Sequence, residues 1–199
     1  EFRDPEKARL LVKQIRDLAG QLDISKEEPL QLMEFCGGHT HTIFRYGIQQ
    51  LLPGSIELIH GPGCPVCVLP MGRIDDCVAI AERPEVIFTT FGDAMRVPGS
   101  RKSLLQAKAD GADIRMVYSP LDALELARKN PGREVVFFAA GFETTSAPVA
   151  AMMVEGVPDN LSLLLSGRLT WPAVAMLLDS GAAGFDALVA PGHVSTVMG

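Results

Sequence analysis

The chain has 199 residues and a formal net charge of −6, with an isoelectric point near 5.2. So acidic a chain lacks the basic surface that phosphate backbones require, which argues against nucleic acid as its main partner. Hydrophobic residues make up 47% and charged residues 21%, which indicates a globular protein and excludes disorder. The length allows one large or two small domains.

The sequence favours a cytoplasmic location. No apolar stretch approaches the ~20 residues of a membrane span. Residues 1–20 have the charge and spacing of a helix rather than of a signal peptide. We therefore expect a cytoplasmic protein with reduced thiols. Because the chain opens at Glu1 without methionine and closes at Gly199 after a strand with no covering helix, we expect a fragment of a longer protein.

Asp4-Pro5 and the apolar residues up to Leu22 predict a first helix. After it, short apolar runs alternate regularly with helical patterns. The apolar runs predicted as strands are residues 30–35, 55–60, 86–91, 113–118, 134–140, 161–165 and 186–190. The predicted helices between them are residues 41–52, 71–82, 101–110, 120–130, 143–155 and 171–180. This rhythm predicts an α/β fold of Rossmann-like parallel sheets with helices on both faces.

The Asn130-Pro131-Gly132 turn is the best candidate for a domain boundary, since the strand–helix pattern restarts after it. We expect a first α/β domain over residues 1–131, which carries the cysteine motifs. A second, similar domain would begin over residues 132–199 and be incomplete in this chain.

Residues suited to chemistry follow the predicted strands. Cys36-Gly37-Gly38-His39 comes after the first strand, Gly61-Pro62-Gly63-Cys64 after the second, and the Gly92–Gly99 loop after the third. Ligands of open parallel sheets bind beyond the carboxyl ends of the strands. The sequence therefore predicts a cleft that the first four such loops line.

Cys64-Pro65-Val66-Cys67 is a C-x-x-C motif, whose two thiols can close a small disulfide or hold one metal ion. A helix that began near Val68 would stabilise a thiolate there. The alternative is an inert pair of thiols beside a loop.

Cys36 is followed by two glycines, which let backbone N–H groups approach a ligand, and by His39 and His41. A cysteine near an imidazole suits metal ligation or a histidine-activated nucleophile. The alternatives are a buried core thiol for Cys36 and a solvent-facing or capping side chain for His41. His60 can equally be a hydrogen-bonded turn residue.

Three further residues allow either a structural or a functional interpretation. Cys77 lies on the apolar face of a predicted helix, which favours a core position. Glu143 lies in Gly141-Phe142-Glu143-Thr144-Thr145, a strand-to-helix turn suited to anions but without the lysine of a Walker A motif. Asp93 can bind a polar ligand or pair only with Arg96.

Five motifs in order resemble the HypD family of maturation factors for nickel–iron hydrogenases. They are Cys36–His41, Gly61–Cys67, Thr90–Gly99, Gly141–Thr145 and Pro191–Ser195. The resemblance implies a scaffold on which iron receives two cyanides and one carbon monoxide before transfer to the hydrogenase large subunit. It implies two partners, a HypC-type small chaperone and a HypE-type cyanide donor.

The resemblance also implies roles for individual residues. Cys36 would hold the iron, with His39 close by, and Cys64 and Cys67 would form a redox dithiol that shares the metal site. Asp93 and Glu143 would contribute to binding the Fe(CN)2(CO) group.

The fold implied by the resemblance is two similar α/β domains and a third that carries a [4Fe–4S] cluster. Family members hold the cluster cysteines in a C-terminal region, so no cluster ligands can be assigned in this chain. A thiolate suits low-spin ferrous iron with cyanide and carbon monoxide. The resemblance implies a scaffold without turnover rather than an enzyme. Two alternatives stay open: a thiol–disulfide oxidoreductase using Cys64 and Cys67, or a structural zinc site.

Overall fold

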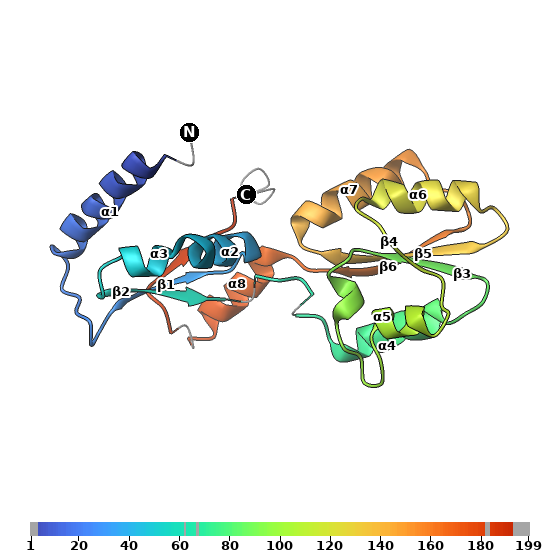
Figure 1. Cartoon of the computed structure of the whole chain (residues 1–199), viewed down its shortest axis with the longest axis horizontal. Coiled ribbons are helices and arrows are strands. Elements are labelled where there is room, and N and C mark those ends of the chain that lie inside the picture. Colours follow the sequence, from blue (N-terminus) through green and yellow to red (C-terminus); the bar gives the residue numbers. More distant parts are fainter. Residues whose placement is uncertain (1–3, 62, 67, 182–183, 193–199) are drawn as a thin grey trace. The chain divides into compact units, whose positions relative to one another are not determined.

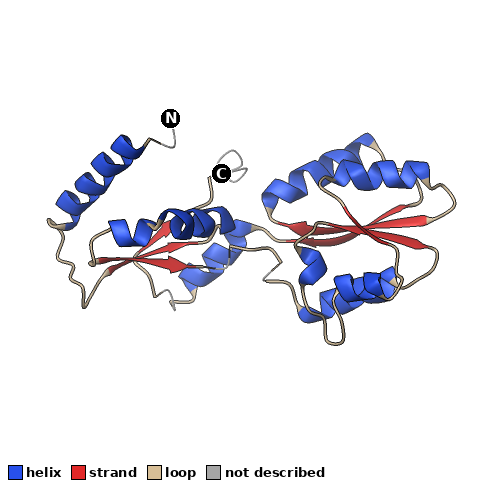
Figure 2. Cartoon of the chain, viewed as in Figure 1, coloured by secondary structure: helices blue, strands red, loops and turns tan. Residues whose placement is uncertain are grey.

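The computed structural model describes residues 4–61, 63–66, 68–181 and 184–192, which form two compact units. Unit 1 contains the residues up to Cys64 and those from Val174 to Gly192, and unit 2 contains Pro65–Ala173. Each unit holds a parallel sheet with helices on both faces (Figures 1 and 2), which confirms the predicted α/β class. None of the helices in the described ranges has the length and hydropathy needed to span a membrane.

Unit 1 is built around β1, the central strand of a three-stranded sheet of order β2-β1-β7. Its strands are β1 (Leu30–Glu34), β2 (Ile56–His60) and β7 (Ala187–Val189), and its helices are α1 (Pro5–Ala19), α2 (Gly37–Tyr46), α3 (Ile48–Leu51) and part of α8 (Thr170–Asp179). Figure 1 shows α2 and α3 on one side of the sheet and α8 on the other. Glu34 and His60 are register partners at the last positions of β1 and β2.

Unit 2 contains a four-stranded parallel sheet of order β4-β3-β5-β6. Its strands are β3 (Val86–Thr90), β4 (Ile114–Met116), β5 (Glu134–Gly141) and β6 (Leu161–Gly167). Helices α4 (Met71–Ala81) and α5 (Leu104–Ala109) cover one face, and α6 (Pro120–Lys129) and α7 (Glu143–Glu155) cover the other (Figure 1). A short 3-10 helix, η1 (Ala94–Arg96), follows β3.

The core of unit 2 lies on both faces of β3 and β5, because successive side chains of a strand point to opposite faces. Phe88 and Phe138 pack against α4 and α5. Ile87 and Phe137 pack against α6 and α7. Burial on both faces explains the long apolar run of β5, which the sequence indicated for residues 134–140.

The structure divides the chain elsewhere than at the predicted boundary near Pro131. The Asn130-Pro131-Gly132 turn joins α6 to β5 inside unit 2, and β5 pairs with β3 from before the turn. The chain returns to unit 1 through α8, and β7 then pairs with β1. A turn signal marks where a helix ends, but it does not specify which strand the next segment will join.

Candidate functional site

The two cysteine loops of unit 1 are bonded to each other through their backbones. The N–H of Gly37 donates to the carbonyl of Gly63 at 3.4 Å, and the N–H of Gly61 donates to the carbonyl of Glu34 at 2.6 Å. Gly37 follows Cys36 directly and Gly63 precedes Cys64 directly. Both cysteines therefore lie in neighbouring loops, beyond the carboxyl ends of β1 and β2.

Only a glycine fits at position 63, because the two loops approach each other so closely there. A Cβ atom at this position would lie 2.5 Å from the backbone N of Cys36 and 2.6 Å from the carbonyl O of Phe35. Backbone atoms of a strand end cannot move aside cheaply, so a side chain here would push the two loops apart.

Cys36 is the N-cap residue of α2, and its side chain makes no capping hydrogen bond. The partial positive charge of a helix N-terminus favours an anionic sulfur at this position. A helix that began near Val68 would have given the C-x-x-C motif the same favourable charge. The helix that follows that motif, α4, begins only at Met71, so Cys36 is the cysteine that adjoins a helix N-terminus directly.

Beneath Cys36 lies Glu34, a carboxylate only 1% exposed that was not among the residues predicted for the site. Its Oε2 accepts the N–H of Cys36 at 3.0 Å, and its Oε1 lies 2.5 Å from both the Thr40 hydroxyl and His60 Nδ1. Burial raises the pKa of Glu34, but the hydrogen bonds from His60, Thr40 and Cys36 outweigh it, so the pKa is lowered. The one signal in the sequence was an acidic residue at the end of an apolar strand.

His39 lies in the first turn of α2 with a buried ring nitrogen. Its Nδ1 has no hydrogen-bond partner among the residues that the structure describes. Because a buried polar atom without a partner is unfavourable, this nitrogen suits a ligand or a bound water. His41, on the same helix, is exposed, in keeping with the alternative of a solvent-facing side chain.

The remaining cysteines have different environments. Cys64 is half-buried, while Cys67 lies outside the described residues, as do His193 and the residues after it. Within the described ranges, no group of three or more His, Cys, Asp or Glu side chains is placed to hold one metal ion. Cys77 is fully buried, which confirms its core position, and burial raises its pKa to about 12.

Asp93 and Glu143 belong to unit 2, whereas Cys36, His39 and Cys64 belong to unit 1. Asp93 is exposed, and its carboxylate accepts the N–H of Ala94. Glu143 is buried and accepts the N–H and hydroxyl of Thr170 at 2.6 and 2.8 Å. These bonds tie the start of α7 to that of α8, a structural use that the sequence did not reveal.

Comparisons with known proteins agree with the motifs. The model of the HypD family, described as the hydrogenase formation hypA family, matches residues 6–199. The chain is 57% identical to the hydrogenase maturation factor HypD of Rhodobacter capsulatus and 55% identical to that of Escherichia coli, in each case over the whole chain and 54% of the relative. It is 50% identical to the hydrogenase expression/formation protein HupD of Azotobacter chroococcum, with the same coverage.

The chain spans about half the length of these curated relatives. The family model nevertheless covers nearly all of it, including the Cys36–His41 and Gly61–Cys67 motifs. The chain therefore belongs to the HypD family of hydrogenase formation proteins.

Proposed function

We propose that this chain supplies the cysteine-bearing part of a scaffold on which the Fe(CN)2(CO) group of nickel–iron hydrogenases is assembled and then passed on. The iron group is cargo, which enters and leaves. The observation that carries the proposal is the backbone bond between Gly37 and Gly63, which holds the Cys36 and Cys64 loops together. Family membership supplies the hydrogenase context.

Cys36 is the proposed iron anchor. Its sulfur adjoins the N-terminus of α2, where negative charge is favoured, and only a thiolate binds metal strongly. His39, in the first turn of α2, has a buried Nδ1 with no partner among the described residues, which suits a role in holding the cargo or one of its ligands.

Cys64 and Cys67 form the proposed redox dithiol, with one of their sulfurs available as a second iron ligand. When the two thiols form a disulfide they would release two electrons and two protons, which the cyanide donor would take up as its bond to cyanide is cleaved reductively. Cys64 lies in the loop whose backbone is hydrogen-bonded to the loop of Cys36. This supports a shared role for the two cysteines.

The proposed partners are a HypC-type chaperone, a HypE-type cyanide donor and, indirectly, the hydrogenase large subunit, all in the cytoplasm. Roles of Asp93 and Glu143 in holding the iron group stay predictions from the family resemblance. For Glu143 such a role would have to coexist with its two bonds to Thr170.

The [4Fe–4S] cluster of the family does not fit the cysteines of this chain. A cluster needs four thiolates. The chain has four cysteines in all, and Cys77 is sealed in the core of unit 2. No step of the proposed function is assigned to a cluster here, and the iron–sulfur domain stays a prediction.

The anchor is tested by comparing Cys36→Ala with Cys77→Ala in the complete gene product, co-expressed anaerobically with its partners. Infrared spectra report the cyanide and carbon monoxide stretching bands. We expect Cys36→Ala to lose these bands and Cys77→Ala, the matched control in the core, to keep them. Full-strength bands in Cys36→Ala would show that another residue holds the iron.

A further inference from the structure

The Glu34–His60 pair lies directly beneath the cysteine loops, and the proposed function gives it no role. Both residues occupy the last register position of their strands, next to the loops that carry Cys36 and Cys64. Glu34 is 1% exposed, whereas the His60 side chain is 32% exposed. The pair thus connects a buried carboxylate to an imidazole that reaches solvent.

The contacts of the His60 ring fix its protonation pattern. An ionised carboxylate can only accept hydrogen bonds, so the 2.5 Å contact between Glu34 Oε1 and Nδ1 requires the proton to lie on Nδ1. In the neutral ring, the lone pair is then on Nε2. The Phe44 ring packs against the imidazole, with centroids 5.1 Å apart, and this limits its rotation.

Glu34 also holds the backbone of the anchor residue. Its second oxygen accepts the Cys36 N–H at 3.0 Å, and Thr40, one turn into α2, donates to the first. One buried side chain thus ties together the end of β1, the start of α2 and the end of β2. A movement of this carboxylate would shift Cys36 and His60 together.

We propose that Glu34 is a positioning residue that keeps the His60 ring protonated at Nδ1, so that its lone pair lies on Nε2, at the end of the strand that leads into the Cys64 loop. This nitrogen is an acceptor for a hydrogen-bond donor such as a thiol, or for a proton-bearing ligand of the cargo. Carboxylate–histidine pairs orient rings in this way next to many metal sites. The link to the iron group rests on the proposed function, while the state of the ring does not.

Glu34→Gln is the variant that should change the tautomer of His60 while leaving the fold intact. The amide oxygen can replace Oε2 as acceptor for the Cys36 N–H, and the amide N–H2 then faces His60 and donates to Nδ1. The Thr40 hydroxyl can rotate to accept. All groups stay bonded, but the proton of His60 must move to Nε2, as in serine-protease triads whose aspartate is replaced by asparagine.

The tautomer is measured by nitrogen-15 NMR of the imidazole-labelled complete gene product at about pH 8, where an imidazole is ordinarily neutral. We expect Nδ1–H in the wild-type protein and Nε2–H in Glu34→Gln. Glu57→Gln, an exposed change on β2 next to Gln31, is the control and should leave His60 as in the wild type. An Nε2–H ring in the wild-type protein, a doubly protonated ring, or the same tautomer in both proteins would overturn the proposal.

The role of the lone pair is measured by the infrared bands. We expect Glu34→Gln to lower the intensity of the cyanide and carbon monoxide bands about 10-fold or more, the usual effect of losing a group that orients a metal site. Should Glu34→Gln fail to fold, His60→Asn provides a second test, because its amide N–H can replace Nδ1–H but nothing replaces Nε2. Full-strength bands in either folded variant would overturn the role of the lone pair. Failure of the anchor would instead be seen in Cys36→Ala, with the NMR result unaffected.

Discussion

At the level of single residues, Gly63 decides how closely the two cysteine loops can approach. Gly63→Ala would place a methyl group against the backbone of Phe35 and Cys36. We expect it to destabilise unit 1 by about 1–3 kcal/mol, as overpacking does, and to weaken the infrared bands. Thermal unfolding and the spectra of the assembled complex provide the two measurements.

Gly72→Ala is the matched control for this substitution. Gly72 lies in the first turn of α4, and a Cβ there meets nothing within 4 Å. Since alanine favours a helix by up to about 1 kcal/mol over glycine, the control should be neutral or stabilising. Equal effects of the two substitutions would show that crowding at Gly63 is not the cause.

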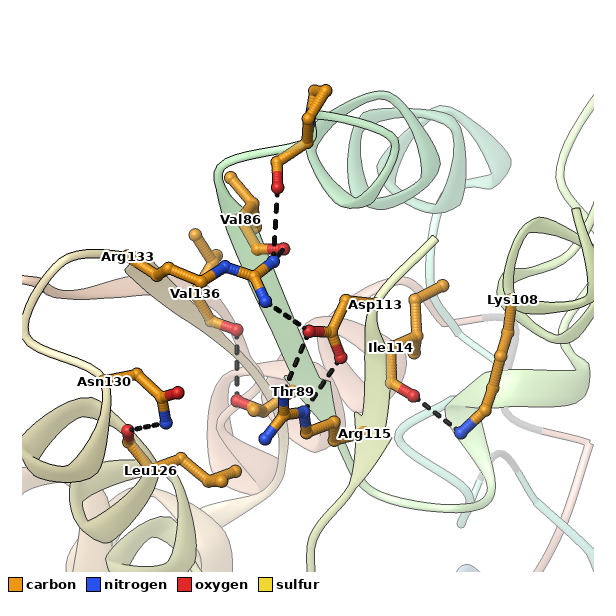
Figure 3. Close-up of polar contacts among 11 residues, drawn as sticks. Val86, Thr89, Lys108, Asp113, Ile114, Arg115, Leu126, Asn130, Arg133 and Val136 are labelled. Atoms are coloured by element: carbon orange, nitrogen blue, oxygen red, sulfur yellow. Dashed lines mark hydrogen bonds and ion pairs between the residues drawn. The ribbon is translucent and has the colours of Figure 1, made fainter. Parts of the chain in front are cut away.

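Asp113 makes the folding stability of unit 2 depend on pH. Hydrogen bonds from Arg115 lower its pKa most, burial opposes them, and Arg133 lowers it further (Figure 3). Arg133 also donates to the carbonyls of Pro84 and Val86, so the cluster joins the start of β3 to the residue before β5. Because the folded pKa lies below the ordinary 3.8, the stabilisation is complete above that pH and is lost as the pH falls through the lowered value.

We expect Asp113→Asn to be less stable than the wild-type protein near neutral pH. The difference in free energy of unfolding should shrink between about pH 5 and pH 2, because protonation removes the same charge in the wild type. Urea unfolding at a series of pH values measures it. A difference that stayed constant across this range would contradict the ion-pair explanation.

At the level of elements, the helices of unit 2 depend on their caps. Ser119 and Asp122 form a capping box at the start of α6, in which the Ser119 hydroxyl accepts the N–H of Leu121 and Asp122 accepts the N–H of Ser119. Ser119→Ala should lower stability by about 1 kcal/mol, the usual effect of losing such a cap. Chemical denaturation followed by circular dichroism checks this value.

Ser100→Ala is the control for the cap. Ser100 is exposed, and its backbone N–H is the group that bonds Asp75, so removing its hydroxyl should change stability by less than about 0.5 kcal/mol. If both substitutions had the same effect, the capping interaction would not be what stabilises α6.

Local pattern predicted the seven strands that lie in the described residues, because apolar runs of this length between turn residues are too short for most helices. The start of α2 was missed. The sequence placed it near residue 41, since glycine disfavours helices, yet the helix begins at Gly37. The backbone bond from Gly37 to Gly63 and the bonds of Glu34 to the Cys36 N–H and the Thr40 hydroxyl outweigh that preference. Gly47, with φ of 58°, ends α2 and separates it from α3.

At the level of the whole molecule, strand pairing could not be predicted from the sequence. β7 joins β1 across more than 150 residues, and Asp186 accepts the N–H of Gln31 while donating its own N–H to the Gln31 carbonyl. Nothing in a local pattern encodes such a partner. The cysteine loops were predictable from residue types, whereas Glu34 was not, because its role depends on β1 and β2 being neighbours.

The two units differ in how completely their strands are buried. Every residue of β3 and nearly every residue of β5 is buried, whereas most of β1 and β2 is half-buried or exposed. We expect the amides of β3 and β5 to exchange with solvent deuterium more slowly than those of β1 and β2. Slower exchange in unit 1 would contradict this order of local stability.

The iron-anchoring role of Cys36 is tested most directly by X-ray absorption at the iron edge. The spectrum is the difference between the complete gene product with and without the iron group loaded in the presence of its partners, so that any iron of the expected iron–sulfur domain cancels. In the wild-type protein we predict sulfur scatterers beside the short bonds to carbon, and a loss of sulfur coordination in Cys36→Ala but not in Cys77→Ala. An iron shell without sulfur, or one that Cys36→Ala leaves unchanged, would contradict the proposed scaffold.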